Sequence, residues 1–473
     1  MQTAESLVAL AAERQSRGQH DGALAAIGAG IALEPGSTGL HLLQGMILRG
    51  LGKATAESGL LRASAIAAND SRPHVQLGGC HESAGRLHRA LQSFRRAAAL
   101  EPAYSETWIG LARLAYEEGG ARLTMTYRAR ALVCDAKADV GQLLMMALIA
   151  LGRWREVWPL LEADLVRRRS PEAEIVPETT AAKMGHDAEQ IEYLVGLGRL
   201  PPSMAETAIF YRHLQGLLPK EGNPTIILQG EARQRVAPTY NRLLYRDPGA
   251  AIDGPAVNRA LDADAIAQAY FSSRPEMAVI DDLLTPEALA ALLRYCREST
   301  VWFTSAYSGG YVGAYVGDGF AAPILFQIAD ELKARLSAII GDAGLHQLWA
   351  FKYDSRLAGI ALHGDAARIN VNFWITPDEA NLDPTSGGLE VYDVAAPPDW
   401  NFNTYNGDLA AIREYLDRTG SRSIVVPHRQ NRAVLFNSDL FHRTGDIHFR
   451  AGYLNRRINV TMLFGTRRTH LPK

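Results

Sequence analysis

Three side chains in the last quarter of the chain have the types and the spacing of metal ligands. His363 and Asp365 form a His-x-Asp triplet, and His442 lies far along the chain from them. Two ligands separated by one residue in a turn can reach one metal ion, and the third must come from a distant strand that folds beside them. We therefore interpret His363, Asp365 and His442 as one catalytic metal site. His448, a few residues after His442, is the alternative third ligand.

Two imidazoles and one carboxylate are the facial triad of non-haem Fe(II) oxygenases. Three protein ligands on one face of an octahedron leave three neighbouring positions open. Those positions suit a bidentate 2-oxo acid and dioxygen. A purely structural interpretation is also open, because a His-x-Asp turn can cap a strand and His442 can be a hydrogen-bonded core residue.

The segments around these residues have the pattern of short strands with Gly, Pro and Asp in the turns. This pattern favours a β-sandwich or barrel. A helix is expected over residues 285–296, with Thr285 as its N-cap and Pro286 in its first turn. A second helix is expected over 323–340, after a Gly/Tyr-rich loop at 307–319. Strands are expected at 347–353, 360–362, 368–376, 389–394, 423–426, 433–437 and 457–464.

The chain from about residue 275 to 465 resembles the Fe(II)/2-oxoglutarate-dependent dioxygenases. The resemblance rests on the order strand, His-x-Asp, strand, Gly387-Gly388 turn, strand, Phe436-x-x-x-x-x-His442, and arginine on the last strand. It implies a double-stranded β-helix (jelly-roll) barrel with flanking helices. It also implies an oxidoreductase, a hydroxylase of unactivated carbon, that uses Fe(II), 2-oxoglutarate and O2, with ascorbate as reductant.

The same resemblance implies that Arg457 pairs with the distal carboxylate of 2-oxoglutarate, which a planar guanidinium suits. Arg456 is the neighbour from which Arg457 must be distinguished, because adjacent strand residues face opposite ways. Arg457 is preferred because Asn459 and Thr461 share its face and are polar. The open alternative is that Arg457 pairs with an acid such as Asp439.

Three further residues are candidates for the co-substrate pocket. Tyr353 matches a tyrosine that hydrogen-bonds the co-substrate in prolyl-hydroxylase-like members of the family. Asn372 and Asn459 alternate with apolar residues on their strands and are expected to line the pocket. Tyr353 as a core residue and Asn372 on a half-buried sheet face are the structural alternatives.

The first third of the chain repeats. Gly18, Gly52, Gly85, Gly119 and Gly152 recur every 33 or 34 residues between Ala/Leu-rich helical segments, a period typical of helical repeats. One unit, with Leu77-Gly78, Gly85, Ala90, Phe94, Ala97 and Pro102, resembles the tetratricopeptide repeat. We expect an all-α tetratricopeptide-repeat solenoid over residues 1–168, a helical connector over 169–236 and the dioxygenase-like domain over 237–473.

A repeat solenoid offers a concave binding face. We expect this face to capture a protein or peptide that the barrel then hydroxylates. One alternative is the same chemistry on a small molecule, such as an amino acid or a biosynthetic intermediate, with the repeats forming a homodimer. Another is a non-catalytic repeat scaffold with a degenerate barrel.

Composition limits the partners and the compartment. Lys and Arg number 49 against 51 Asp and Glu, for a net charge of -2, so we expect no nucleic-acid partner. The three cysteines, Cys80, Cys134 and Cys296, are too few and too widely spaced for a disulfide framework. Without a signal peptide or a long apolar run, we expect no membrane partner and a cytoplasmic protein.

Overall fold

The computed structural model describes residues 3–53, 55–117, 120–135, 141–305, 310–353 and 359–467. The chain forms two compact units, residues 1–147 (unit 1) and 148–473 (unit 2). The division lies within helix α9 (Gly141–Ala150). The predicted domain limits at 168 and 236 stay a prediction. No helix in these described ranges is long and apolar enough to cross a membrane.

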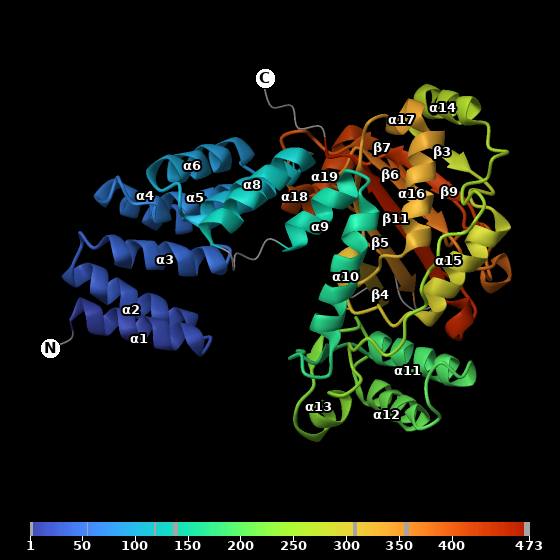
Figure 1. Ribbon diagram of the computed structural model, residues 1–473, viewed down its shortest axis with the longest axis horizontal. Coiled ribbons are helices and arrows are strands. Elements are labelled where there is room, and N and C mark those ends of the chain that lie inside the picture. The colour runs from blue at the N-terminus through green and yellow to red at the C-terminus, as the bar shows by residue number, and fades with distance from the viewer. Residues whose placement is uncertain are drawn as a thin grey trace. The chain divides into compact units, whose positions relative to one another are not determined.

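Unit 1 is a series of antiparallel helix pairs, as the repeat period predicts (Figure 1). The glycine between the helices of a pair has positive φ at Gly18, Gly52 and Gly85, a conformation that glycine adopts without strain. Gly119 lies outside the described residues. The pairs are α1 (Ala4–Ser16) with α2 (His20–Leu33), α3 (Thr38–Gly50) with α4 (Ala56–Ile66), α5 (Ser71–Ser83) with α6 (Leu87–Leu100), and α7 (Ser105–Glu117) with α8 (Ala121–Cys134).

The repeat residues of the third pair pack as the tetratricopeptide pattern predicts. Ala90, Phe94 and Ala97 are buried on one face of α6. A Cβ atom on Gly78 would lie 2.7 Å from the Phe94 ring, and one on Gly110 would lie 2.3 Å from it. Glycine at these two positions therefore lets the ring fit between α5 and α7. Unit 1 is thus a tetratricopeptide-like helical repeat.

Unit 2 combines helices with two antiparallel sheets (Figure 1). Its helix α10 packs on this unit: Trp154 donates to Asp330 and stacks on Phe326. The helices are α10 (Trp154–Arg169), α11 (Ala181–Gly196), α12 (Met204–Leu217), α13 (Gly230–Val236), α14 (Ala263–Ser272), α15 (Pro286–Glu298), α16 (Pro323–Arg335), α17 (Ser337–Ile340), α18 (Phe402–Gly407) and α19 (Leu409–Thr419), with short 3-10 turns at Val316–Asp318, Asp378–Ala380 and Tyr453–Asn455.

The larger sheet has the strand order β3-β9-β6-β11-β5-β4, and the smaller has the order β10-β7-β8. A separate pair, β1 (Glu178–Thr179) and β2 (Ile226–Ile227), lies in the segment that joins α10 to α13. The other strands are β3 (Met277–Ile280), β4 (Tyr311–Tyr315), β5 (Leu345–Tyr353), β6 (Ile369–Trp374), β7 (Leu389–Ala395), β8 (Ser423–Val426), β9 (Ala433–Asn437), β10 (Leu440–Thr444) and β11 (Arg457–Phe464).

The two sheets share one hydrophobic core. It joins side chains of β3, β6 and β9 in the larger sheet to side chains of β7, β8 and β10 in the smaller: Met277, Trp374, Leu389, Val391, Val426, Val434, Phe436 and Leu440. Each sheet keeps free edges among the described strands, so the pairings do not form a closed barrel. The described strands therefore form two facing antiparallel sheets, and the expected double-stranded β-helix stays a prediction.

Several elements differ from the sequence-based expectation. The expected strand at 360–362 is absent, and only His363 beyond it forms a bridge, to His442. Tyr311–Tyr315, expected within a loop, is strand β4 because its alternate tyrosines pair with the aromatic face of β5. The expected helix at 323–340 breaks at Leu336 into α16 and α17. The helix beginning at Pro286 is confirmed, with the Thr285 side chain capping Ala288.

Phe94 should be a main contributor to the stability of unit 1. It is 1% exposed, whereas Phe271 on α14 is 53% exposed. Phe94→Ala should cost about 3–5 kcal/mol of unfolding free energy, because it leaves a cavity between three helices. Phe271→Ala should cost less than about 1 kcal/mol. Urea unfolding measures both, and equal losses would contradict this packing.

Candidate metal centre

His363, Asp365 and His442 lie together, and their ligand atoms are all within 4.8 Å of one another. The Nε2 atom of His363 is 3.6 Å from one oxygen of Asp365, and the Nε2 atom of His442 is 3.4 Å from the other. The main chain causes this approach. The His363 amide donates to the His442 carbonyl at 3.0 Å, and the His442 amide donates back at 2.9 Å.

The tautomers of both histidines suit metal binding. The Nδ1 atom of His363 lies 2.8 Å from the Ala361 carbonyl, and that of His442 lies 3.0 Å from the Leu440 carbonyl. A carbonyl oxygen only accepts, so each Nδ1 carries the proton. Each Nε2 then presents its lone pair toward Asp365, the arrangement that metal-binding histidines adopt.

The carboxylate of Asp365 is buried and oriented by a neighbour. Asn370, on β6, donates from Nδ2 to its Oδ2 at 2.7 Å. Burial alone would raise the pKa of Asp365. The neighbouring His442 and His363 and the Asn370 hydrogen bond outweigh burial and lower that pKa. Asp365 is therefore an anion at neutral pH, as a metal ligand must be.

His363 is held neutral by its surroundings. Burial lowers its pKa to about 4, and the nearby His442 contributes in the same direction. His448, the alternative third ligand, lies outside this cluster. It is exposed, and its backbone carbonyl accepts from Leu382. The structure thus brings His442, and not His448, to the His-x-Asp turn.

Arg457 lines the same cavity and is 1% exposed. Its guanidinium donates to the carbonyls of Gly387 and Gly388 and to the side chain of Asn459. It lies 4.6 Å from the centre of the Tyr353 ring. Burial lowers its pKa, and Tyr353 partly offsets that effect. No carboxylate of the described residues pairs with this buried cation.

Arg456 and Asp439 have other partners. Arg456 donates to Glu189 on α11 at 2.8 Å, on the opposite face of β11. Asp439 accepts from Arg467 at 2.7 Å, so it does not neutralise Arg457. The buried charge of Arg457 is therefore available to an anion in the cavity, because an unpaired cation in a protein interior is costly.

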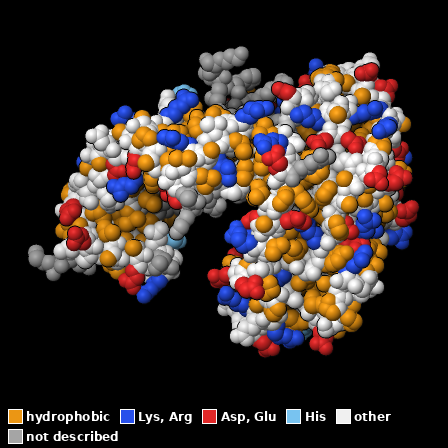
Figure 2. Space-filling view, in the orientation of Figure 1, with side chains coloured by type: hydrophobic (Ala, Val, Ile, Leu, Met, Phe, Trp, Pro, Cys, Tyr) orange, Lys and Arg blue, Asp and Glu red, His pale blue; other side chains and the backbone are white. Residues whose placement is uncertain are grey.

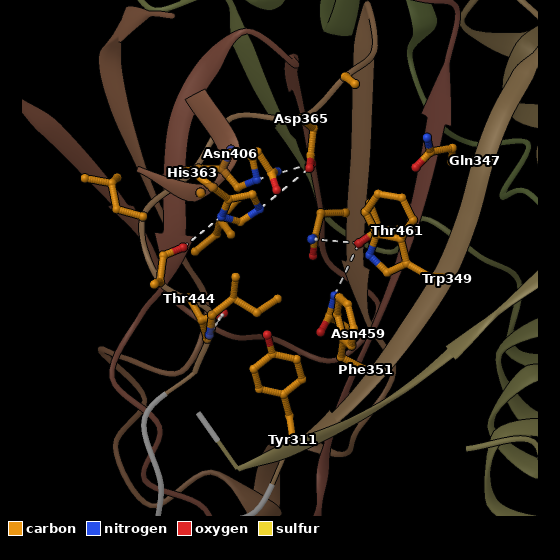
Figure 3. Close-up of a pocket in the computed structure, with 18 of the residues that line it drawn as sticks. Tyr311, Gln347, Trp349, Phe351, His363, Asp365, Asn406, Thr444, Asn459 and Thr461 are labelled. Atoms are coloured by element: carbon orange, nitrogen blue, oxygen red, sulfur yellow. Dashed lines mark hydrogen bonds and ion pairs between the residues drawn. The ribbon is translucent and has the colours of Figure 1, made fainter. Parts of the chain in front are cut away.

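The cavity has a volume of about 400 Å³, and all three ligands line it. Figure 3 shows His363 and Asp365 at its edge. Tyr353, Asn372 and Asn459 lie in its lining, and their contact with a co-substrate stays a prediction. Asn372 and Asn459 both donate to the hydroxyl of Thr461, at 3.1 and 3.3 Å. These side chains form a polar floor beside Arg457.

An aromatic wall, made of Tyr311, Tyr315, Trp349 and Phe351, lines another side of the cavity. Its four residues were not among those expected at the site from the sequence. The period-two rule for strands could have found Trp349 and Phe351, which alternate with Gln347 and Tyr353 on β5. It could not find Tyr311 and Tyr315, because their segment was expected to be a loop.

No family model and no curated protein sequence matches this chain. Solved structures that resemble part of this chain include MamA, at 16% identity, TM-score 0.30 and coverage of 37% of this chain and 98% of that one. A thermophilic TPR protein of Thermus thermophilus has 14% identity, TM-score 0.32 and coverage of 36% and 93%. The epimerase SnoN, solved with Fe3+, alpha-ketoglutarate and a nogalamycin compound, has 14% identity, TM-score 0.33 and coverage of 44% and 87%.

Substituting the two competing histidines distinguishes them. His442→Ala should lower Mn(II) affinity more than about 100-fold, because a direct ligand matters more than the hydrogen bonds that orient one. His448→Ala should bind Mn(II) like the wild type. Anaerobic calorimetric titration measures both affinities. Loss of binding in His448→Ala with retention in His442→Ala would contradict this ligand set.

Proposed function

We propose that the chain is an Fe(II)- and 2-oxoglutarate-dependent dioxygenase that hydroxylates an unactivated carbon. The observation that carries the proposal is the pairing, in one cavity, of a two-histidine, one-carboxylate cluster with a buried arginine that has no carboxylate partner among the described residues. The cluster fits a divalent iron ion. The arginine fits the distal carboxylate of a dicarboxylic 2-oxo acid.

The sheet topology supports a double-stranded β-helix for this domain. From β5 to β11, successive segments alternate between the two sheets, except that β7 and β8 follow one another in the smaller sheet. The segment at His363 bridges to β10, the outer strand of the smaller sheet. The larger sheet takes β5, β6, β9 and β11, and the smaller takes the His363 segment, β7, β8 and β10. This winding is what a jelly roll with two open edges requires.

When bound, Fe(II) and 2-oxoglutarate supply the oxidising chemistry: one atom of O2 enters the succinate formed with loss of carbon dioxide, and the other enters the substrate as a hydroxyl group. The residues of this chain bind and orient. Arg457 anchors the dicarboxylate, and the Tyr353 hydroxyl, 3.4 Å from that of Thr444, lies on the same side of the cavity. His363, Asp365 and His442 hold the metal.

In this proposal the aromatic wall limits the access of water to the cavity that the metal ligands line. Phe351 packs edge-on against Tyr311 at 5.0 Å and against Tyr315 at 5.9 Å between ring centres. Exclusion of water protects a reactive site from side reactions. The wall also offers an apolar surface against which an unactivated C–H group can lie.

For the substrate, we propose a protein or peptide segment bound by unit 1. Stacked helix pairs present extended binding surfaces. Apolar side chains gather over α2 and α3 on the face drawn in Figure 2, and Leu33 and Met46 of these helices are exposed. A degenerate scaffold has no need for Arg457, because a buried unpaired cation lowers stability.

Purified full-length chain with Fe(II), 2-oxoglutarate and ascorbate should release succinate. Arg457→Gln should weaken 2-oxoglutarate binding to the Mn(II)-loaded chain more than about 30-fold, since truncating a buried charge contact costs about 2–5 kcal/mol. Arg456→Gln removes the ion pair with Glu189, on the opposite face of β11, and should bind 2-oxoglutarate as the wild type does. Calorimetry measures binding, and succinate analysis measures turnover. A wild-type chain that binds neither Fe(II) nor 2-oxoglutarate would contradict the proposal.

A further inference from the structure

The metal-ligand turn is held by α18, a helix inserted between β7 and β8. Gly364, between the ligands His363 and Asp365, donates its amide to the Tyr405 carbonyl at 2.8 Å. The Gly364 carbonyl accepts from Nδ2 of Asn406 at 2.9 Å. Both peptide groups of Gly364 therefore bond to two successive residues of α18.

The rest of the turn is fixed by β10, which carries the third ligand, and by the turn between β9 and β10. His363 bonds to His442 through both its amide and its carbonyl, and the Asp365 amide donates to Ser438. These bonds hold the two ends of the turn. The two peptide groups of Gly364 join His363 to Asp365, so their orientation sets the directions of these two side chains. Both peptide groups are hydrogen-bonded to α18.

The helix α18 is itself firmly attached. Tyr405 is buried in a cluster with Leu362 and Phe441, each next to a metal ligand in sequence. The guanidinium of Arg467 lies 4.2 Å from the centre of the Tyr405 ring. The same guanidinium bonds to the side chain of Asp439 and to the carbonyls that lead into α18, those of Ala396, Pro397 and Trp400.

Asn406 also faces the cavity. It lines the cavity together with Phe402 and Leu409 of the same insert, and Figure 3 shows it beside His363. One side chain thus bonds to the backbone of the ligand turn and borders the space in which a substrate would lie. Its neighbour Asn403, on the same helix, is exposed and lies outside this cavity.

We propose that Asn406 is a positioning residue, which sets the metal affinity and the coordination geometry by orienting His363 and Asp365 through Gly364. This inference rests on the proposed metal site. Residues that orient direct ligands commonly contribute 10- to 100-fold in metal affinity. The insert that builds one wall of the cavity is, in this proposal, also part of the metal site.

The test uses the full chain and Co(II), whose absorption spectrum reports coordination geometry, under anaerobic conditions. Asn406→Ala and the similarly sized, neutral Asn406→Leu should both weaken Co(II) binding about 10- to 100-fold and change its visible spectrum. Asn403→Ala is the matched control, and it should keep the wild-type affinity and spectrum. All the metal-free variants should unfold at the same temperature within a few degrees.

Two results would overturn the positioning role. One is wild-type affinity and spectrum in both Asn406 variants while the wild type binds Co(II). The other is a weakening in Asn403→Ala equal to that in Asn406→Ala, which would indicate a general effect of the helix surface. A wild-type chain that binds no Co(II) overturns the metal site itself, and the positioning role with it.

Discussion

The two backbone hydrogen bonds that join His363 to His442 are the constraint on which the site depends. They pair residues from distant parts of the chain, at 3.0 and 2.9 Å, and bring the two imidazole rings to 4.4 Å between centres. Rings this close, with both Nδ1 protons directed to backbone carbonyls, present two lone pairs to one point. Asp365 supplies the charge at that point, since its lowered pKa keeps it ionised although it is buried.

A second constraint acts from the far side of the cavity. Strand β11 is buried along its whole length between β5 and β6, so each of its side chains must suit an interior. Arg457, Asn459 and Thr461 face the cavity, and their polar groups bond to one another, to neighbouring strands or to the Gly387-Gly388 turn. The positive charge of Arg457 is the one part of this face that the described residues leave uncompensated. In our proposal the dicarboxylate compensates it.

Much of this arrangement could be predicted from local patterns. The period of the glycines predicted the helix pairs of unit 1, and alternation along the last strand separated Arg457 from Arg456. The strands at 423–426, 433–437 and 457–464 begin and end as expected.

The predictions of secondary structure that failed concern segments whose structure depends on contacts with distant parts of the chain. Tyr311–Tyr315 is a strand because β5 pairs with it. Residues 360–362 form no strand, because the segment meets β10 through single contacts at Ile360 and His363 and not through a continuous ladder. Nothing local relates Asn406 to Gly364, forty-two residues earlier, so its role could emerge only from the folded chain.

The most direct test of the ligand set is a crystal structure of the full chain soaked with Mn(II) and 2-oxoglutarate in the absence of oxygen. The proposal predicts one strong anomalous peak within bonding distance of Nε2 of His363, Nε2 of His442 and a carboxylate oxygen of Asp365. It also predicts that the distal carboxylate of 2-oxoglutarate is bound to the guanidinium group of Arg457. A metal bound elsewhere, or a dicarboxylate bound away from Arg457, would contradict it.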